Sequence, residues 1–345
     1  MKDHYEVTIG IPVYKSADCI HETLCSVLNQ SFEDIEFLII DDCGGDGSMD
    51  EVSLFQRTHP RGGNIRILRN NRNRGVSYSR NLIIDEAKGH YLFFMDSDDF
   101  VEPHTIQILY NALINNQAQV AYGSYEIIDK VGYASIRVYQ KDSIVLKGDN
   151  ELALYAFKNN DVFHVSVCNF LIDLRFLRQV GLRFVDVDYW EDMAFTTELV
   201  TIVNKAVLLS DVTYHYIRRP SSLSHYQKRL SLNKQEILKT ISVIDYLKDK
   251  CQSMRGRPYL TYLGYNLEMI SFYMVCYILK SFRIIVPRFT YKEMRDIMCH
   301  PLQIQDIVGN SHRIIANIVF YLFGKMPICI FIPSIWLAGK IKKTL

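Results

Sequence analysis

Several features that would place this chain in a special class are absent from its sequence. The eight cysteines show no CxxC spacing and no paired framework, which argues against a zinc site or a secreted disulfide scaffold and favours a reducing compartment. No apolar signal segment precedes the first strand-like run, so we expect synthesis and retention in the cytoplasm. The chain also shows no internal repeat and no low-complexity linker.

Charge is balanced overall but not along the chain. The net charge of +1 gives no argument for nucleic acid as a partner, and we expect none. With 345 residues, 48% of them hydrophobic, the chain can form two domains or one domain with a large appendage. No acidic residue follows Asp306, whereas five basic residues do: Arg313, Lys325, Lys340, Lys342 and Lys343.

Hydrophobic periodicity organises the first 125 residues. Short apolar runs that are typical of buried strands alternate with amphipathic stretches that are typical of helices. Strands are predicted at 7–11, 35–40, 65–68 and 91–95, and helices at 20–28, 76–87 and from about 103. Ser48, after a glycine-rich turn, is expected to cap a further helix. This alternation predicts an α/β fold with a parallel sheet covered by helices on both faces.

The rest of the chain divides into two parts. Residues 126–228 are less regular, with strand-like runs at 135–138, 144–146, 207–209 and 212–217. From about residue 230 the pattern is helical to the end. We therefore predict an α/β domain over 1–228 and a helical region over 229–345.

Polar residues gather where the predicted strands end. Pro12 and Tyr14 follow the first strand, Asp41–Asp42 the second and Asp96–Asp99 the fourth. Ligands of such sheets bind at the carboxyl ends of the strands. The carboxylates of 96–99 repel one another and need a counter-charge, and oxygen ligands favour Mg²⁺ or Mn²⁺ held together with substrate phosphates. The loop predicts a metal–diphosphate site; the alternative is a solvated turn with helix-capping acids.

Five segments together resemble the family 2 glycosyltransferases, which have the GT-A fold. The segments, in order, are 11–14, 41–48, 73–81, 96–99 and Glu191–Asp192. The resemblance covers about residues 5–225 and implies a Rossmann-like, mostly parallel central sheet followed by a helical C-terminal region. It also implies a nucleotide-binding half at 1–125 and an acceptor half at 126–228. Cys43–Gly44 stands where the family usually has Gly-Ser, which changes a turn and should remove no ligand contact.

The resemblance implies a nucleotide-sugar donor, expected to be a UDP-sugar, carrying a hexosyl or N-acetylhexosaminyl group. Pro12 and Tyr14 would wall the nucleobase, with the Tyr14 ring stacking on it. Asp42 would accept a hydrogen bond from the uracil ring N–H. The structural alternatives are an ordinary half-buried aromatic at Tyr14 and a turn-capping acid at Asp42.

Two further residues of these segments are assigned to the nucleotide. Asn73 and Arg80 would contact it or close the floor beneath it, and the planar guanidinium suits a diphosphate or a carboxylate. The alternative for Arg80 is a structural clamp on Asp41 or Asp96.

The resemblance also implies roles around the metal. Asp98 would be the direct ligand of Mg²⁺ or Mn²⁺, and Asp96 would contact the ribose or support the metal through water. Asp99 is expected to be a supporting or helix-capping residue. His215 is a candidate additional ligand, although a histidine in an apolar strand is more often structural, and we favour that role.

Asp192 is the residue to which the resemblance assigns base catalysis. In inverting members, this carboxylate takes the proton of the acceptor hydroxyl, whose oxygen attacks the anomeric carbon opposite the leaving diphosphate. Glu191 would hold a sugar hydroxyl, and repulsion between the two acids would raise one pKa. Trp190 would stack on an acceptor sugar or lie in the core. The alternative for the acid pair is a helix N-terminus favoured by the dipole.

Basic and hydroxyl residues at 218–224 occupy the position where the family often closes a loop over the diphosphate. Arg218 and Ser222 are the candidates, with the register open to Arg219.

The C-terminal stretch 314–339 contains one charged residue, Lys325, near its middle, and is interrupted by Pro327 and Pro333. Its length could span a bilayer, but a charge at mid-bilayer is unfavourable. An in-plane element on the inner face of the cytoplasmic membrane fits better; packing in the core, an oligomer interface and a true span are the alternatives. The apolar segment 260–287 is expected to pack beside it.

Together these features predict a metal-dependent, inverting glycosyltransferase. Membrane docking would suit a glycan or lipid-linked glycan acceptor in bacterial surface-polysaccharide assembly. The alternatives are a catalytically inactive nucleotide- or glycan-binding scaffold and, less favoured, a nucleotidyltransferase, because the residues after the first strand lack its glycine-rich basic loop.

Overall fold

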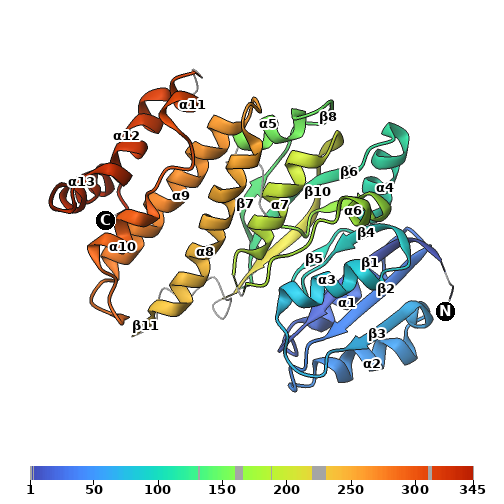
Figure 1. The fold of residues 1–345 in the computed structure, drawn as a ribbon. Coiled ribbons are helices and arrows are strands. Elements are labelled where there is room, and N and C mark those ends of the chain that lie inside the picture. The colour runs from blue at the N-terminus through green and yellow to red at the C-terminus, as the bar shows by residue number, and fades with distance from the viewer. Residues whose placement is uncertain are drawn as a thin grey trace. The chain divides into compact units, whose positions relative to one another are not determined.

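The structure is a computed structural model that describes residues 2, 4–130, 133–159, 166–187, 189–219, 231–309 and 313–344. These residues form two compact units (Figure 1). The N-terminal unit comprises residues 1–152 and 161–222, and the C-terminal unit residues 153–160 and 223–345, in each case where the structure describes them. The predicted boundary at residue 228 lies outside the described residues.

One ten-stranded sheet forms the centre of the N-terminal unit. Four parallel neighbours make its first part, in the order β3 (Ile65–Arg69), β2 (Ile35–Asp41), β1 (Tyr5–Val13) and β4 (Gly89–Phe94). Its second part continues through β9 (Phe170–Asp173), β6 (Val120–Asp129), β10 (Lys205–Arg218) and β5 (Phe100–Val101). The last two strands lie off this path: β7 (Ala134–Tyr139) pairs with β6, and β8 (Ile144–Lys147) pairs with β10.

Helices flank the centre of this sheet, which explains why strands such as β1 and β2 are apolar on both faces. All seven residues of β2 are buried, as expected for a strand with both faces covered. The helices of this unit are α1 (Ile20–Leu28), α2 (Ser48–Thr58), α3 (Val76–Glu86), α4 (Thr105–Asn116), α6 (Leu174–Val180) and α7 (Glu191–Ile202); α5 (Glu151–Lys158) runs from this unit into the next. Among them, α3 contacts β1 and β2, α6 contacts β4 and β9, and α4 contacts β6 and β9.

The predicted strands and helices of the first 125 residues are confirmed to within a few residues, with one correction. Ser48 does not cap α2 but is its first residue; the N-cap is Gly47, at φ 91°. The Ser48 hydroxyl instead donates to Asp46 Oδ1 at 2.5 Å. The sequence analysis did not predict β6, because Gly123 and Ser124 interrupt its apolar run. Glycine is needed there, since a Cβ at Gly123 would lie 1.9 Å from Thr213 Oγ1 on β10.

The C-terminal unit is helical, as predicted. Its helices are α8 (Lys234–Lys250), α9 (Leu260–Lys280), α10 (Tyr291–Ile297), α11 (Ile304–Val308), α12 (Ile314–Lys325) and α13 (Ile328–Ile341), beside a two-residue pairing of β11 (Leu232–Asn233) with β12 (Ile285–Val286). The long helix α9 contacts α8, α10, α12 and α13. The expectation that segment 260–287 packs beside the C-terminal stretch is therefore confirmed for α9. None of the described helices is long and apolar enough to cross a membrane.

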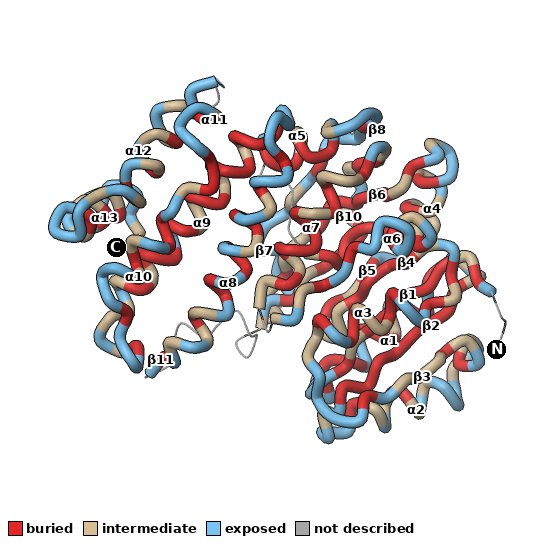
Figure 2. Tube along the Cα trace, in the orientation of Figure 1, coloured by how far each residue is buried: buried red, intermediate tan, exposed pale blue. Residues whose placement is uncertain are grey.

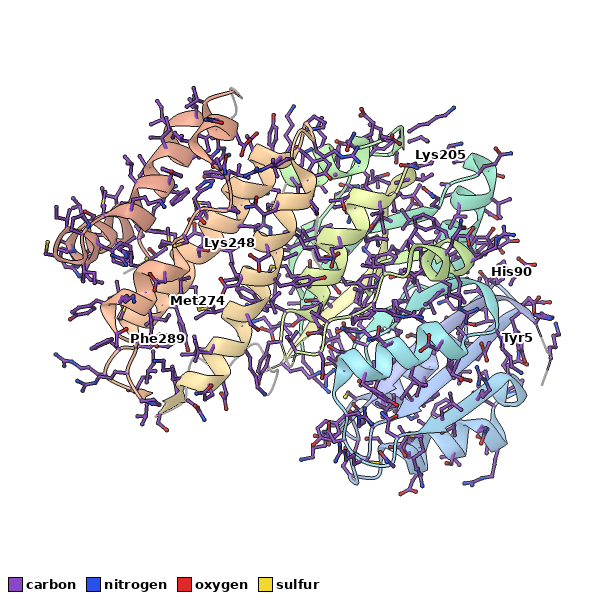
Figure 3. The ribbon with its side chains drawn as sticks, viewed as in Figure 1. Tyr5, His90, Lys205, Lys248, Met274 and Phe289 are labelled. Carbon is purple, nitrogen blue, oxygen red and sulfur yellow. The ribbon has the colours of Figure 1, made fainter. Side chains whose placement is uncertain are left out.

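A buried ion pair ties α8 to α9. Lys248, labelled in Figure 3, places its Nζ 2.6 Å from Glu268 Oε1. The same ammonium donates to the carbonyl oxygens of Ile297 and Cys299, at the end of α10. Burial raises the pKa of Glu268 to about 7, although Lys248 acts in the opposite direction. This charge pair is enclosed within the helical core, because neither side chain is exposed.

Candidate active site

The carboxyl ends of β1, β2 and β3 meet at one edge of the sheet. Val13 lies opposite Asp41, and Asp41 lies opposite Arg69, in register. A cavity of about 440 Å³ opens at this edge, lined by Val13, Lys15, Asp41, Arg69 and the turn 43–50. This hollow carries two cations, Lys15 and Arg69, and of the predicted polar residues at the strand ends only Asp41 lines it.

The turn that lines this cavity is held by side chain to backbone contacts. Asp46 Oδ2 accepts from the Ala17 N–H at 2.9 Å, which joins the turn to the segment after β1. At Gly44, a Cβ would lie 2.6 Å from the Lys15 nitrogen, so the close approach requires glycine. Cys43 adopts φ 58°, a conformation that glycine adopts more readily, and its Sγ donates to the Asn70 carbonyl. Cys43 and Gly44 therefore form part of a tight turn at this edge of the sheet.

Asp42 turns away from the cavity lining into a neighbouring loop. Its Oδ1 accepts from Asn70 Nδ2 at 2.7 Å and from the Arg74 N–H at 2.8 Å, and its Oδ2 from the Gly75 N–H at 2.9 Å. Asn73 Oδ1 also accepts from the Gly75 N–H, at 3.0 Å. In this structure, Asp42 and Asn73 therefore order the turn before α3, whereas Asp41 lines the cavity together with Asp46 and Asp50.

Pro12 and Tyr14 lie at the end of β1. Pro12 pairs with Ile40 in the register of the sheet. The Tyr14 ring is 43% exposed, and Lys15 Nζ lies 5.3 Å from its centroid. This ring is available to a stacking partner, as its predicted role requires.

The acids after β4 form a compact cluster. Carboxylate oxygens of Asp96, Asp98 and Asp99 all lie within 4.8 Å of one another. Asp99 is buried and already satisfied, because it accepts from the Tyr214 hydroxyl at 2.6 Å and from the Ile217 N–H at 2.8 Å. Burial, and then the Asp98 carboxylate, raise the pKa of Asp99 well above its usual range. The expectation of a supporting role for Asp99 therefore agrees with its contacts.

Asp98 is the most exposed acid of this cluster, at 43%. Burial and then the Asp96 carboxylate raise its pKa to about 6, while Arg219 acts in the opposite direction. Arg219 Nη2 lies 3.2 Å from Asp98 Oδ2 and donates to the Asp98 carbonyl oxygen. The residue between Asp96 and Asp98 is Ser97, whose hydroxyl forms a hydrogen bond of 2.6 Å with the Ser16 hydroxyl. This bond holds the acidic loop against the segment that follows β1. The partly exposed Asp96 and Asp98 fit the oxygen donor set of a hard divalent cation.

Arg80 connects the acid cluster to α7. Its Nη2 donates to Asp96 Oδ1 at 2.8 Å and its Nη1 to Glu191 Oε1 at 2.6 Å, although the two acids are 95 positions apart (191 − 96). Burial alone would lower the pKa of this buried guanidinium, but Asp96 and then Glu191 outweigh burial and raise it. Arg80 therefore does clamp Asp96, as one of its two predicted roles, whereas Asp41 pairs with Arg69 at 2.7 Å instead.

Asp192 lies beside this bridge, in the first turn of α7. It is half-buried, and its Oδ1 accepts from the Met193 N–H at 2.7 Å. Burial and then the Glu191 carboxylate raise its pKa to about 7, against the opposing effect of Arg80. The repulsion expected between the two acids is thus present, although burial contributes more. Trp190, the N-cap residue of α7, is half-buried and adopts φ 64°.

Two candidate residues, Arg218 and His215, make other contacts than the predicted ones or lie exposed, and a third lies outside the described residues. Arg218 is exposed at the end of β10, and the next residue, Arg219, makes the contact with Asp98. Ser222 lies outside the described residues. His215 is held by Glu102 at 2.7 Å and Glu126 at 3.2 Å, which agrees with the structural role we favoured.

Sequence reasoning missed two residues that pack on the acids. The Tyr214 hydroxyl holds Asp99, as described above, and the buried Cys168 thiol lies beside Asp96. Burial and then Asp96 raise the pKa of Cys168 well above its usual range, so this thiol is not poised as a nucleophile. Neither residue stands in a motif, and only the fold brings them to Asp96–Asp99.

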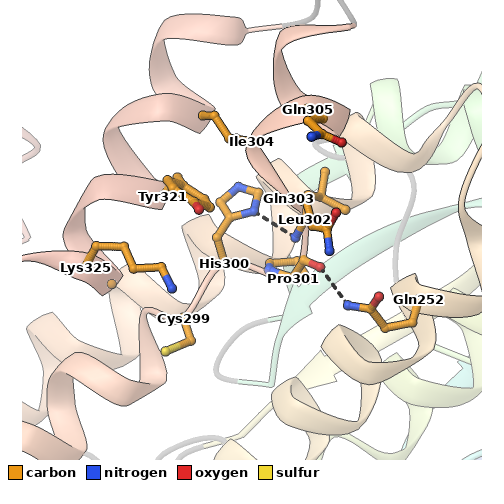
Figure 4. A pocket seen from close by; sticks show the side chains of 11 residues that line it. Gln252, Cys299, His300, Pro301, Leu302, Gln303, Ile304, Gln305, Tyr321 and Lys325 are labelled. Atoms are coloured by element: carbon orange, nitrogen blue, oxygen red, sulfur yellow. Dashed lines mark hydrogen bonds between the residues drawn. The ribbon is translucent and has the colours of Figure 1, made fainter.

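A second cavity of about 440 Å³ lies within the C-terminal unit (Figure 4). His300 and Gln252 line it, and both are engaged: the Leu302 N–H donates to His300 Nδ1, and Gln252 donates to the Pro301 carbonyl oxygen. None of the predicted site residues lines this cavity. The predicted site residues instead lie where β1, β2 and β4 end and at the start of α7, and we take this region as the candidate active site.

Residues 8–181, more than half of the chain, match the model of the glycosyl transferase family 2. The chain belongs to this family. Its enzymatic activity is accordingly glycosyl transfer, and the resemblance seen in the five sequence segments is confirmed.

Relatives and solved structures agree with this assignment. The chain is 26% identical over 212 residues to an uncharacterized glycosyltransferase from Haemophilus influenzae, covering 61% of this chain and 78% of that protein. It is 26% identical over 216 residues to a poly(ribitol-phosphate) beta-glucosyltransferase from Bacillus spizizenii, covering 61% of this chain but 32% of that longer protein. The crystal structure of S. aureus TarS 1–349 in complex with UDP-GlcNAc superposes with a TM-score of 0.64 at 15% identity, covering 92% and 90% of the two chains. The GT-A fold is thereby confirmed.

Proposed function

We propose that this glycosyltransferase is inverting and metal-dependent, and that it moves a hexosyl or N-acetylhexosaminyl group from a UDP-sugar to a hydroxyl of a glycan or lipid-linked glycan. We place it in bacterial surface-polysaccharide assembly, at the inner face of the cytoplasmic membrane. The UDP-sugar is suggested by the UDP-GlcNAc bound to TarS, and the glycan acceptor by the poly(ribitol-phosphate) relative. The observation that carries the proposal is the Arg80 bridge, which joins the acids after β4 to the acid pair that begins α7.

In this proposal the donor nucleotide binds at the edge of the sheet where β1 and β2 end, over Tyr14 and beside Asp42. Tyr14 stacks on the base, with Pro12 completing the wall. Asp42 reads the uracil N–H through Oδ2, for which the structure gives a single hydrogen bond, so acceptor capacity is left. Asn73 holds the turn behind the base, and Arg218, Ser222 or Arg219 meets the diphosphate.

Mg²⁺ or Mn²⁺ would be held by Asp98, with Asp96 supporting it. These acids fit the group because they supply oxygen ligands only, lie close together and are partly exposed. A bound divalent ion would neutralise the charge that builds on the departing diphosphate. Arg80 holds Asp96 in place, and Arg219 supplies positive charge beside Asp98.

Asp192 serves as the general base. The acceptor O–H gives its proton to the Asp192 carboxylate as the oxygen forms a bond to the anomeric carbon. The bond from that carbon to the β-phosphate oxygen breaks, and its electron pair leaves with UDP. A pKa near 7 suits this role, since the ionised base is present at neutral pH while its proton affinity is high. Glu191 and Trp190 are assigned to the sugars on either side of this base.

A screen of nucleotide sugars with Mn²⁺ tests the proposal. Release of UDP from one or a few UDP-sugars, slowly to water and faster when an acceptor glycan is added, is the expected result. Tight UDP binding without turnover of any donor, with or without acceptor, would favour an inactive scaffold instead. Turnover confined to donors with another nucleotide would overturn the assignment of Asp42.

A further inference from the structure

The last two helices of the chain expose apolar side chains on one side each. On α12, Ile315, Val319 and Leu322 are exposed at spacings of four and three residues, which places them on one helical face. On α13, the exposed residues Ile330, Leu337 and Ile341 follow the same rule, with spacings of seven and four. Ile315 is 77% exposed and Ile341 74%. Figure 2 shows how much of α12 and α13 is exposed or half-buried.

The opposite sides of these helices are already used by the core. Phe331, Ile335 and Gly339 recur every four residues on α13 and are buried, and α13 contacts α9 and α10. Phe320 and Phe323, three residues apart, are buried on α12, which contacts α9, α10 and α11. The exposed residues are therefore a second apolar surface, which the core of the C-terminal unit does not need.

The segment that carries these exposed residues has only positive charge. The chain carries no acid after Asp306, and the lysines at 325, 340, 342 and 343 are all exposed. Lys340 Nζ lies 4.8 Å from the ring centroid of Trp336, which is itself 54% exposed. Tryptophan beside lysine on an exposed apolar helix is the composition of helices that lie in the headgroup region of a bilayer.

A cationic hollow adjoins the end of α13. A cavity of about 430 Å³ is lined by Lys280, the last residue of α9, by Arg283, which follows this helix, and by Thr344. Among the described residues, neither cation has a carboxylate partner. The hollow thus offers two unneutralised charges next to the apolar surface, as a lipid phosphate requires.

We propose that α12 and α13 form a docking face for an anionic phospholipid bilayer, with the hollow at Lys280 and Arg283 receiving a headgroup phosphate. This inference rests on the proposed function in one respect: docking would bring the enzyme to a lipid-linked acceptor. A second copy of the chain is a poorer occupant. A twofold interface through this face would bring its lysines toward their own symmetry mates, and lysine is depleted in interface cores.

Flotation of the full-length protein with vesicles tests the docking face. Vesicles of phosphatidylcholine with 30% phosphatidylglycerol should bind at least about tenfold more protein than vesicles of phosphatidylcholine alone, since each cation near the surface is worth roughly fivefold in affinity. The double variant Trp336→Ser/Leu337→Ser should lower binding to anionic vesicles at least about tenfold. The variant Leu54→Ser, which removes an exposed leucine of α2, should bind as wild type.

The variant Lys280→Ser/Arg283→Ser tests the hollow by itself. It should reduce the preference for anionic over neutral vesicles, and an unchanged preference would overturn the assignment of the headgroup phosphate. Thermal unfolding of each variant shows that the fold is kept.

Two results would overturn the docking face: a folded wild type that floats with neither vesicle, or a dimer that the Trp336→Ser/Leu337→Ser variant converts to a monomer. Hydrolysis of UDP-sugars in solution is read in parallel. Hydrolysis without vesicle binding would refute the docking face alone, and vesicle binding without turnover would refute the proposed function alone.

Discussion

Asp192 in the N-terminal unit and Glu268 in the C-terminal unit are acids whose pKa is raised to about the same value, yet their surroundings differ. Both shifts are caused first by burial. Glu268 has no exposed surface, and its nearest charge is Lys248, which holds helices together. Asp192 is half-buried, and its next influence is another acid, Glu191, at the edge where the strands end.

The comparison separates a structural acid from one that we propose to be catalytic. A raised pKa shows that the charged form lacks solvation, and it occurs in both units. What distinguishes Asp192 is access to solvent and a place near Asp96, to which Arg80 connects its neighbour Glu191. Geometry therefore assigns the function, and the pKa only agrees with it.

The largest effect on turnover is expected at Asp192. Asp192→Asn should lower kcat by about 10²–10⁴, because the acceptor proton loses its base. UDP affinity, measured by calorimetry, should remain within about threefold of wild type, since the variant keeps the shape of the side chain. Asp186→Asn, an exposed acid shortly before the same helix, is the matched control and should keep full activity. Wild-type turnover in Asp192→Asn would remove this residue from the mechanism.

The pH dependence of turnover is expected to show the second largest effect. The base must be ionised, and its pKa lies at about 7, so kcat/KM should fall about tenfold for each pH unit below 7 and level off above it. UDP binding at the same pH values separates loss of the base from loss of the donor. A flat profile down to pH 5 would mean that no group with the pKa of Asp192 acts as the base.

The smallest effect on turnover is expected at Glu268. Glu268→Gln should leave kcat within about twofold, because this acid lies in the helical core.

Its effect should appear in stability instead. The pKa of Glu268 is about 7 in the folded state and near 4.5 in the unfolded chain, so between these pH values the folded state binds more protons. The wild type therefore loses folding stability as the pH rises from about 4.5 to about 7. The glutamine variant should reduce this loss by roughly 1–3 kcal/mol, measured by chemical unfolding at pH 5 and pH 7. An unchanged pH dependence would show that Glu268 is not protonated in the folded chain.

Hydrophobic patterns in short segments predicted the strands and helices, because these elements depend on nearby residues. The strands that end at Val13, Asp41 and Phe94 are apolar runs. Acids follow the last two of these strands, because a buried strand ends where charged side chains begin. The acid pair that begins α7 was found through the order of the segments, not through its own pattern, which suits any helix N-terminus.

Contacts between distant segments could not be read from the sequence. Arg80 reaches residues 16 and 111 positions away, and Tyr214 reaches Asp99 across 115 positions. Neighbouring positions also make different contacts: Arg219, and not Arg218, pairs with Asp98, and Asp41, and not Asp42, pairs with Arg69. Successive side chains of an extended segment point to opposite sides, so an error of one position moves a residue to the wrong face.

The central claim is that the acids after β4 hold a divalent ion that binds the diphosphate of UDP. Titration calorimetry of UDP, with and without Mn²⁺, in wild type and in Asp98→Asn tests it most directly. We predict that Mn²⁺ tightens UDP binding to wild type at least about tenfold, and that the variant loses this enhancement while keeping its metal-free affinity. Equal UDP affinity of the wild type with and without Mn²⁺, or full enhancement in the variant, would contradict the account.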